Sequence, residues 1–147
     1  MSSPILLEKN TQILPADRLV VLLPEYTVDL STLGRIIRDL ALRHVSKVFL
    51  LTVVKEPFAG VHMAHVQGYL YAVTHDPFLH VETSVQVETT WLRAIRAIWQ
   101  PGDLFLCLSD HMVRWGVFWQ KPIAELITQQ IDAPVYVITV ENGLEKV

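Results

Sequence analysis

The chain has a single cysteine, Cys107, and few charged side chains, which make up 18% of its 147 residues. One cysteine cannot form a disulfide within the chain or build a metal site from several thiolates, and it suits a reducing compartment. The formal net charge of −3 offers no basic surface of the kind that binds nucleic acids. We therefore expect no thiolate metal centre and no nucleic-acid partner.

Long hydrophobic runs and targeting signals are also missing. No run approaches the roughly 18 to 20 apolar residues that cross a bilayer. The first ten residues, MSSPILLEKN, lack both the basic flank and the long apolar core of a signal peptide. We expect a cytoplasmic protein without membrane insertion.

The sequence contains no recognisable enzyme motif. It has no Walker loop, no dinucleotide-binding GxGxxG and no nucleophile elbow. The spacing of His62 and His65 places both on one helical face, but two ligands do not complete a metal site and no carboxylate follows at the next helical repeats. We therefore expect no catalytic residue and no metal.

What the sequence does contain is a regular succession of short apolar runs and helical segments. Apolar residues make up 51% of the chain, which favours a sheet buried on both faces. Helix caps are expected at Asp29 or Ser31 and at Thr89 or Thr90. The helical pattern from Phe58 to Thr74 is carried by Val61, Ala64, Gly68 and Ala72. The strands expected from the apolar runs are Leu19–Leu23, Lys47–Val54, His80–Val87, Leu104–Leu108 and Val135–Val140.

The alternation of strands and helices predicts an α/β fold, a three-layer sandwich with a five-stranded parallel sheet between helices on both faces. The strand from His80 to Val87 alternates apolar and polar residues, which indicates a position at the edge of the sheet. The predicted domain covers residues 18–140. An extension, 1–17, either packs against it or stays mobile, and a tail, 141–147, follows.

Three apolar segments stand out within this order of elements: Val21-Leu22-Leu23-Pro24, Gly102-Asp103-Leu104-Phe105-Leu106 and Ala133-Pro134-Val135-Tyr136-Val137-Ile138. Together with the order of the elements, they resemble the universal stress protein family, which belongs to the adenine-nucleotide α-hydrolase-like superfamily, and the resemblance covers about Arg18 to Val140. It implies a stress-response or regulatory domain with the strand order 3-2-1-4-5. It also implies a homodimer through the fifth strand, whose apolar edge we expect to be open. The expected interface residues are Val135, Tyr136, Val137, Ile138, Thr139 and Val140.

Many members of that family bind ATP through a glycine-rich loop after strand four, with the pattern Gly-x2-Gly-x9-Gly-Ser/Thr. Backbone amides approach the phosphates there because glycine adds no bulk. This chain departs from the pattern, since Gly116 is the one glycine between Ser109 and Lys121. We therefore expect a regulatory or binding domain without a cofactor, which does not bind ATP in the usual family mode.

Two other hypotheses remain open. In parallel sheets ligands bind beyond the carboxyl ends of the strands, so an adenine nucleotide, ATP or AMP, would be held or slowly hydrolysed there by a different loop. Alternatively, the chain is a regulatory domain of a transporter or another larger assembly. The residues expected to line a cleft at this edge are Glu25, Tyr26, Ser109, Asp110, His111, Arg114, Gly116 and Lys121.

Large aromatic residues, Trp115, Phe118 and Trp119, follow the fourth strand in what the sequence predicts to be a loop. Such side chains fill a core, cover a ligand or present a surface to a protein partner. All three roles stay open, and the segment from Trp115 to Trp119 is the expected site for a protein partner.

Overall fold

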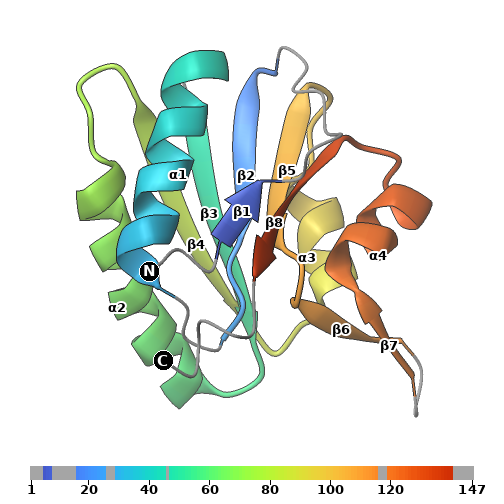
Figure 1. Cartoon of the computed structure of the whole chain (residues 1–147). Coiled ribbons are helices and arrows are strands. Elements are labelled where there is room, and N and C mark those ends of the chain that lie inside the picture. Colours follow the sequence, from blue (N-terminus) through green and yellow to red (C-terminus); the bar gives the residue numbers. More distant parts are fainter. Residues whose placement is uncertain (1–4, 8–15, 26–28, 46, 116–118, 141–147) are drawn as a thin grey trace.

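The computed structural model describes residues 5–7, 16–25, 29–45, 47–115 and 119–140. Its centre is a sheet whose parallel strands lie in the order β4-β3-β2-β5-β8 (Figure 1). In chain order this is 3-2-1-4-5, so the predicted α/β sandwich and strand order are confirmed. The five parallel strands are β2 (Arg18–Leu22), β3 (Lys47–Val54), β4 (His80–Val87), β5 (Asp103–Leu108) and β8 (Val135–Val140).

Helices cover both faces of the sheet (Figure 1). Successive residues of a strand point to opposite faces, so Leu19 and Val21 pack against α1 and α2, whereas Val20 and Leu22 pack against α3 and α4. None of the helices in the described part of the chain is long and apolar enough to cross a membrane. The four helices are α1 (Leu30–His44), α2 (Pro57–Thr74), α3 (Trp91–Ile98) and α4 (Ile123–Gln130).

Two of the predicted caps form. The Asp29 carboxylate accepts hydrogen bonds from the Thr32 hydroxyl at 2.6 Å and the Thr32 amide at 3.2 Å, and both bonds lower the pKa of Asp29. Thr90 Oγ1 accepts from the Arg93 amide at 3.2 Å. These side chains satisfy first-turn amides that have no partner within their own helix, so α1 and α3 begin where the sequence predicts.

The predicted helix α2 is confirmed, and the residues whose spacing indicated it lie on its exposed face. Val61, Ala64, Gly68 and Ala72 are exposed. The buried residues are Gly60, Met63, Gln67, Leu70 and Thr74. A buried glutamine is accommodated because its Nε2 donates to the carbonyls of Leu50 and Ser84 and to the Thr52 hydroxyl, at 2.8–3.2 Å.

A sixth strand, β1 (Ile5–Leu7), corrects the expectation that the fifth parallel strand has an open edge. This part of the N-terminal extension packs against the domain, running antiparallel to β8 with Leu7 opposite Ile138 and Ile5 opposite Val140. The outer edge of β8 is therefore paired from Ile138 to Val140, because an apolar stretch of the extension forms backbone hydrogen bonds with it.

The predicted aromatic loop is instead a hairpin of two antiparallel strands, β6 (Met112–Trp115) and β7 (Trp119–Pro122). Val113 is buried against α3 and α4, whereas its neighbours Met112 and Arg114 are exposed. That alternation with a period of two is typical of a strand. Figure 1 shows the hairpin beside the start of α4, at the carboxyl end of the sheet.

Helices α1 and α2 approach each other closely at Gly34. A Cβ atom added there would lie 2.5 Å from Val73 Cγ1, whereas one added at Gly68 would have no neighbour within 4 Å. Gly34→Ala should therefore destabilise the protein by about 1 to 2 kcal/mol, because the stiff valine must move.

Gly68→Ala is the matched control and should stabilise the protein by up to about 1 kcal/mol, through helix propensity alone. Urea denaturation of both variants measures the change in the free energy of unfolding, which should be a decrease for Gly34→Ala and an increase for Gly68→Ala. Equal effects would contradict the close contact at Gly34.

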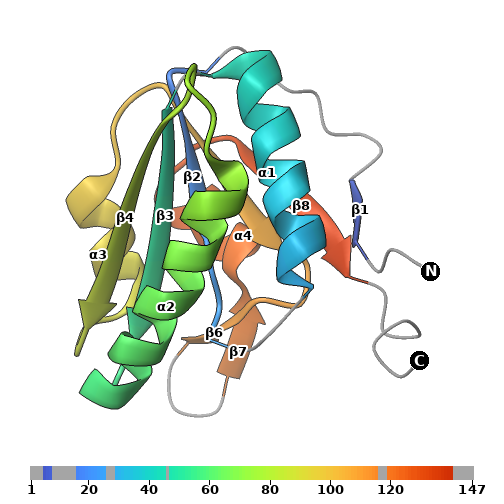
Figure 2. The ribbon, with the colours of Figure 1, turned by 90° about the vertical axis from the view of Figure 1, so that its left-hand side faces the viewer.

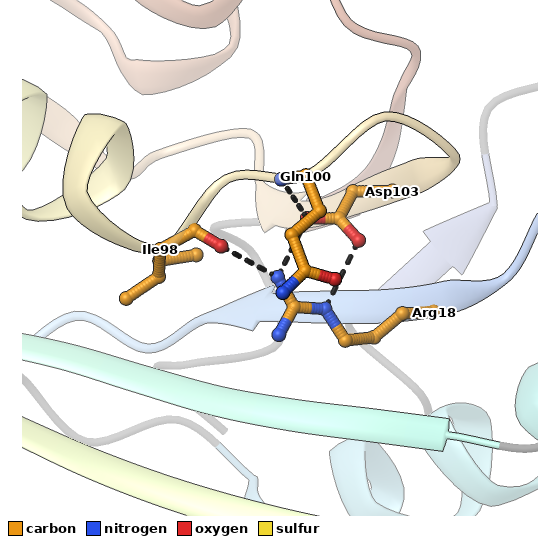
Figure 3. Close-up of polar contacts among 4 residues, drawn as sticks. All are labelled: Arg18, Ile98, Gln100 and Asp103. Carbon is orange, nitrogen blue, oxygen red and sulfur yellow. Dashed lines mark hydrogen bonds and ion pairs between the residues drawn. The ribbon is translucent and has the colours of Figure 1, made fainter.

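A buried ion pair joins the two central strands (Figure 3). Arg18 Nη2 lies 2.7 Å from Asp103 Oδ2, and Arg18 Nε donates to Asp103 Oδ1 at 3.0 Å. Arg18 also donates to the Ile98 carbonyl, and Asp103 accepts from the Gln100 amide. The bidentate pair thus ties β2, β5 and the end of α3 together.

Asp103→Ala should destabilise the protein by about 3 kcal/mol, because it leaves the Arg18 guanidinium largely buried without its counter-ion. Arg38→Ala removes the exposed partner of Asp76 in an ion pair at the surface and should change stability little. The midpoints of urea denaturation compare the two. A small loss for Asp103→Ala would show that the pair is dispensable.

Candidate functional site

A cleft of about 490 Å³ lies at the carboxyl ends of the parallel strands. Its walls come from segments that are distant in sequence: the ends of β2 and β3, the start of α3, the hairpin strand β6 and α4. The lining residues are Glu25, Val53, Val54, Lys55, Thr89, Thr90, Trp91, Leu92, Met112, Val113, Arg114 and Leu126. This is the edge at which parallel α/β sheets bind ligands.

The body of the cleft is apolar. Trp91 is the first residue of α3, directly after the Thr90 cap, and this start of the helix places the indole in the wall. Met112 enters from β6 and Leu126 from α4. An indole and a flexible thioether in one wall suit a planar or apolar ligand, because both are large and polarisable.

Charged residues of both signs also line the cleft. Lys55 follows β3, Arg114 lies on β6 and Glu25 follows β2, and all three side chains are exposed. Two cations beside an apolar wall can hold an anionic group, with the arginine offering a planar pair of donors. The cleft therefore combines an apolar body with charged residues of both signs in its lining.

The cleft brings together only part of the residues predicted from the sequence. Glu25 and Arg114 line it. Ser109 and Asp110 are half-buried and outside its lining, and Lys121, on β7, donates to Gln129 Oε1 at 3.0 Å. His111 is buried. The two others, Tyr26 and Gly116, lie outside the described residues.

Sequence reasoning missed Lys55, Thr89, Thr90 and Trp91. Each follows the carboxyl end of a predicted strand, β3 or β4, and that position was the available signal. The sequence prediction relied instead on the ends of β2 and β5, the strands on either side of the point where the strand order reverses.

No protein-family model matches the chain, and no curated protein does either. Membership of the universal stress protein family therefore stays a prediction.

Trp119 is the one aromatic residue of the hairpin whose side chain is described. It is 71% exposed, so it does not fill the core. A role in contact with a partner or a ligand remains open for it. The side chains of Trp115 and Phe118 lie outside the described residues.

The histidines on α2 do not assemble a metal site. His62 and His65 are both exposed. Across the described ranges, no three His, Cys, Asp or Glu side chains come close enough together to hold an ion. A site would need at least one further protein ligand beside the two.

His111 is buried between the end of β2 and α3, with 2% of its surface exposed. One ring nitrogen donates to the Leu22 carbonyl, and the other, Nδ1, has no hydrogen-bond partner among the residues that the structure describes. Its ring meets Trp91 edge to face, with centroids 4.7 Å apart. Burial lowers the pKa of His111 to about 4, with the bond to Leu22 opposing that shift, so the ring is neutral at physiological pH.

The buried histidine makes stability depend on pH. In the unfolded chain His111 binds a proton below its ordinary pKa of 6.5, whereas in the folded chain it does so only below about pH 4. The free energy of unfolding therefore decreases as the pH falls from 6.5 to about 4. Wild type should lose about 2 kcal/mol more than His111→Phe between about pH 7 and about pH 5.

Urea denaturation at the two pH values measures the loss. His62→Ala, which removes an exposed histidine, is the matched control and should keep the slope of the wild type. An unchanged slope in His111→Phe would assign the pH dependence to another group.

Proposed function

We propose that this chain is a non-enzymatic regulatory domain, similar to universal stress proteins, that binds a small anion with an apolar body. The observation that supports this most strongly is the cleft at the carboxyl edge, with Trp91 and Met112 in its wall and Lys55 and Arg114 among its lining residues. The small size and concave shape of the cleft favour a metabolite over a macromolecule.

The start of α4 argues against binding a triphosphate in the family mode. Helix N-termini hold phosphates through free backbone amides. Here Pro122 has no amide hydrogen, and the Ile123 amide donates to the His111 carbonyl at 2.9 Å. The hairpin strand β6 further replaces a glycine-rich cradle with side chains. A ligand with one anionic group fits these features better than ATP.

The titratable groups support a binding role without catalysis. A general acid or base works best with a pKa near the operating pH and must reach the ligand. His111 is neutral and buried beneath Trp91, outside the residues that line the cleft. The cleft's own Glu25, Lys55 and Arg114 are suited to recognising charge.

Calorimetry with AMP, ATP, adenosine and inorganic phosphate tests the proposed ligand class. We expect AMP to bind more tightly than ATP, because its one phosphate needs no extended cradle, and more tightly than adenosine or phosphate alone. Arg114→Gln and Lys55→Gln should each weaken AMP binding by about tenfold, the effect of losing one charge-assisted hydrogen bond. Arg35→Gln, an exposed substitution on α1, is the control.

Two results would contradict the proposal. Tighter binding of ATP than of AMP would indicate a nucleotide site closer to the family's own. No binding of any of the four compounds, together with no shift in the melting temperature, would remove the adenylate ligand and leave a domain that acts through protein contacts.

Protein contacts are a second part of the proposed function. Trp119 is exposed on the hairpin, and Trp residues are enriched where proteins bind each other. The predicted homodimer also remains a proposal. Because β1 occupies the edge of β8 from Ile138 to Val140, a second copy would reach only Val135–Val137 unless β1 left the sheet.

A further inference from the structure

The opposite edge of the sheet, β4, is open. Among the described residues β4 pairs with β3 alone, over eight residues from His80 to Val87. Figure 2 shows β4 at the near edge of the sheet, with α2 on one side and α3 on the other. The strand contains no proline and no lysine, the residues with which proteins commonly block pairing at an edge.

The backbone groups of β4 that face away from β3 belong to its odd-numbered residues. The amide of Glu88 donates to the Val54 carbonyl at 3.0 Å, so the even-numbered residues point their backbone groups toward β3. The direction alternates along a strand. Val81, Thr83 and Val85 therefore present free N–H and C=O groups along the edge.

We propose that β4 pairs antiparallel with β4 of a second copy of this chain, centred on Thr83, so that one continuous sheet runs through a homodimer. A two-fold axis perpendicular to the sheet passes between the two Thr83 residues. The sheet face that α2 covers in one copy therefore continues into the same face of the second copy. Thr83 then lies opposite Thr83 of the second copy, and Val81 lies opposite Val85. These are the residues whose outward backbone groups need partners.

Charge and side-chain type agree with this register. On the α2 face, valine meets valine and threonine meets threonine, pairs that stabilise antiparallel strands. On the other face, Glu82 meets Ser84 and His80 meets Gln86, so no like charges lie opposite each other. His80 and Glu82 bond to each other at 2.9 Å within one strand. Self-pairing therefore places no like charges directly opposite each other, and the two Glu82 side chains are diagonal neighbours across the axis, each bonded to His80 of its own strand.

Exposed apolar side chains at the two ends of β4 enlarge the contact. Phe78, 83% exposed, precedes the strand, and Phe58, 87% exposed, lies in the first turn of α2, two residues before Gly60, which lies against the Val87 side chain. Antiparallel pairing brings the Phe78 end of one copy to the Val87 end of the other. A stable dimer buries roughly 800 Å² per partner, more than a strand edge supplies, so the proposed interface extends to these exposed side chains.

Light scattering on purified wild type and on charged variants tests the edge. Wild type should show the dimer mass. Thr83→Lys and Thr83→Glu should each show the monomer mass, because each places like charges opposite one another across the axis. An equimolar mixture of the two variants should restore the dimer mass, which a merely misfolded variant cannot do. Circular dichroism confirms that each variant is folded.

Disulfide cross-linking tests the register. Cys107 is buried, and burial raises the pKa of its thiol to about 12, so it does not compete with an introduced cysteine. The two Cα atoms at position 83 should lie about 5.5 Å apart, within disulfide reach. Thr83→Cys should therefore form dimers on oxidation. His80→Cys should not, because its two copies are about 20 Å apart in this register.

Three outcomes would overturn the proposal. They are a wild type that is monomeric in solution, a dimer that persists in both Thr83→Lys and Thr83→Glu, and cross-linking through His80→Cys but not Thr83→Cys. A persistent dimer would assign the interface to another surface, such as the edge of β8. None of these outcomes bears on ligand binding in the cleft.

Discussion

The ion pair between Arg18 and Asp103 determines how the centre of the sheet is assembled. Strands β2 and β5 are buried and apolar on both faces, so several registers between them would bury nearly the same surface. Arg18 and Asp103 are the first residues of these strands and lie opposite each other. Any slip would leave the buried carboxylate without its cation, which costs about 3 kcal/mol, whereas the apolar surface buried by the two strands would change little. The pair therefore selects one register for the two strands on which the other elements are built.

That register aligns the carboxyl ends of β2, β3 and β5 and so creates the candidate cleft. Glu25, Lys55 and Arg114 come from three separate segments, and α3 adds Trp91 to the wall. The position agrees with the family resemblance, whereas the chemistry departs from it. A hairpin replaces the glycine-rich loop, and the amide of Ile123 at the start of α4 is already bonded to the His111 carbonyl. The position of the cleft is thus that of a nucleotide site in the family, whereas its residues differ from the family's phosphate-binding pattern.

The two edges of the sheet differ in their strand pairing. At one edge β1 returns from the N-terminal extension and pairs with the end of β8. At the other, β4 pairs with β3 alone among the described residues and contains neither proline nor lysine. The candidate cleft lies at the ends of the strands, away from the lateral edge, so the proposed ligand binding and the proposed self-association involve separate surfaces. Their closest approach is the turn from Val87 to Trp91, which connects the open strand to the wall of the cleft.

By itself, the sequence determined the order of strands and helices, the caps at Asp29 and Thr90 and the edge position of β4, because apolar runs, capping side chains and alternation are local signals. It predicted two cleft residues, Glu25 and Arg114. Only the tertiary structure decided the rest: the hairpin, the pairing of β1, the cleft wall and the buried face of α2. These depend on contacts between residues far apart in the chain. Gln67 shows the reason, since a polar residue is buried in α2 because acceptors on β3 and β4, remote in sequence, satisfy its amide.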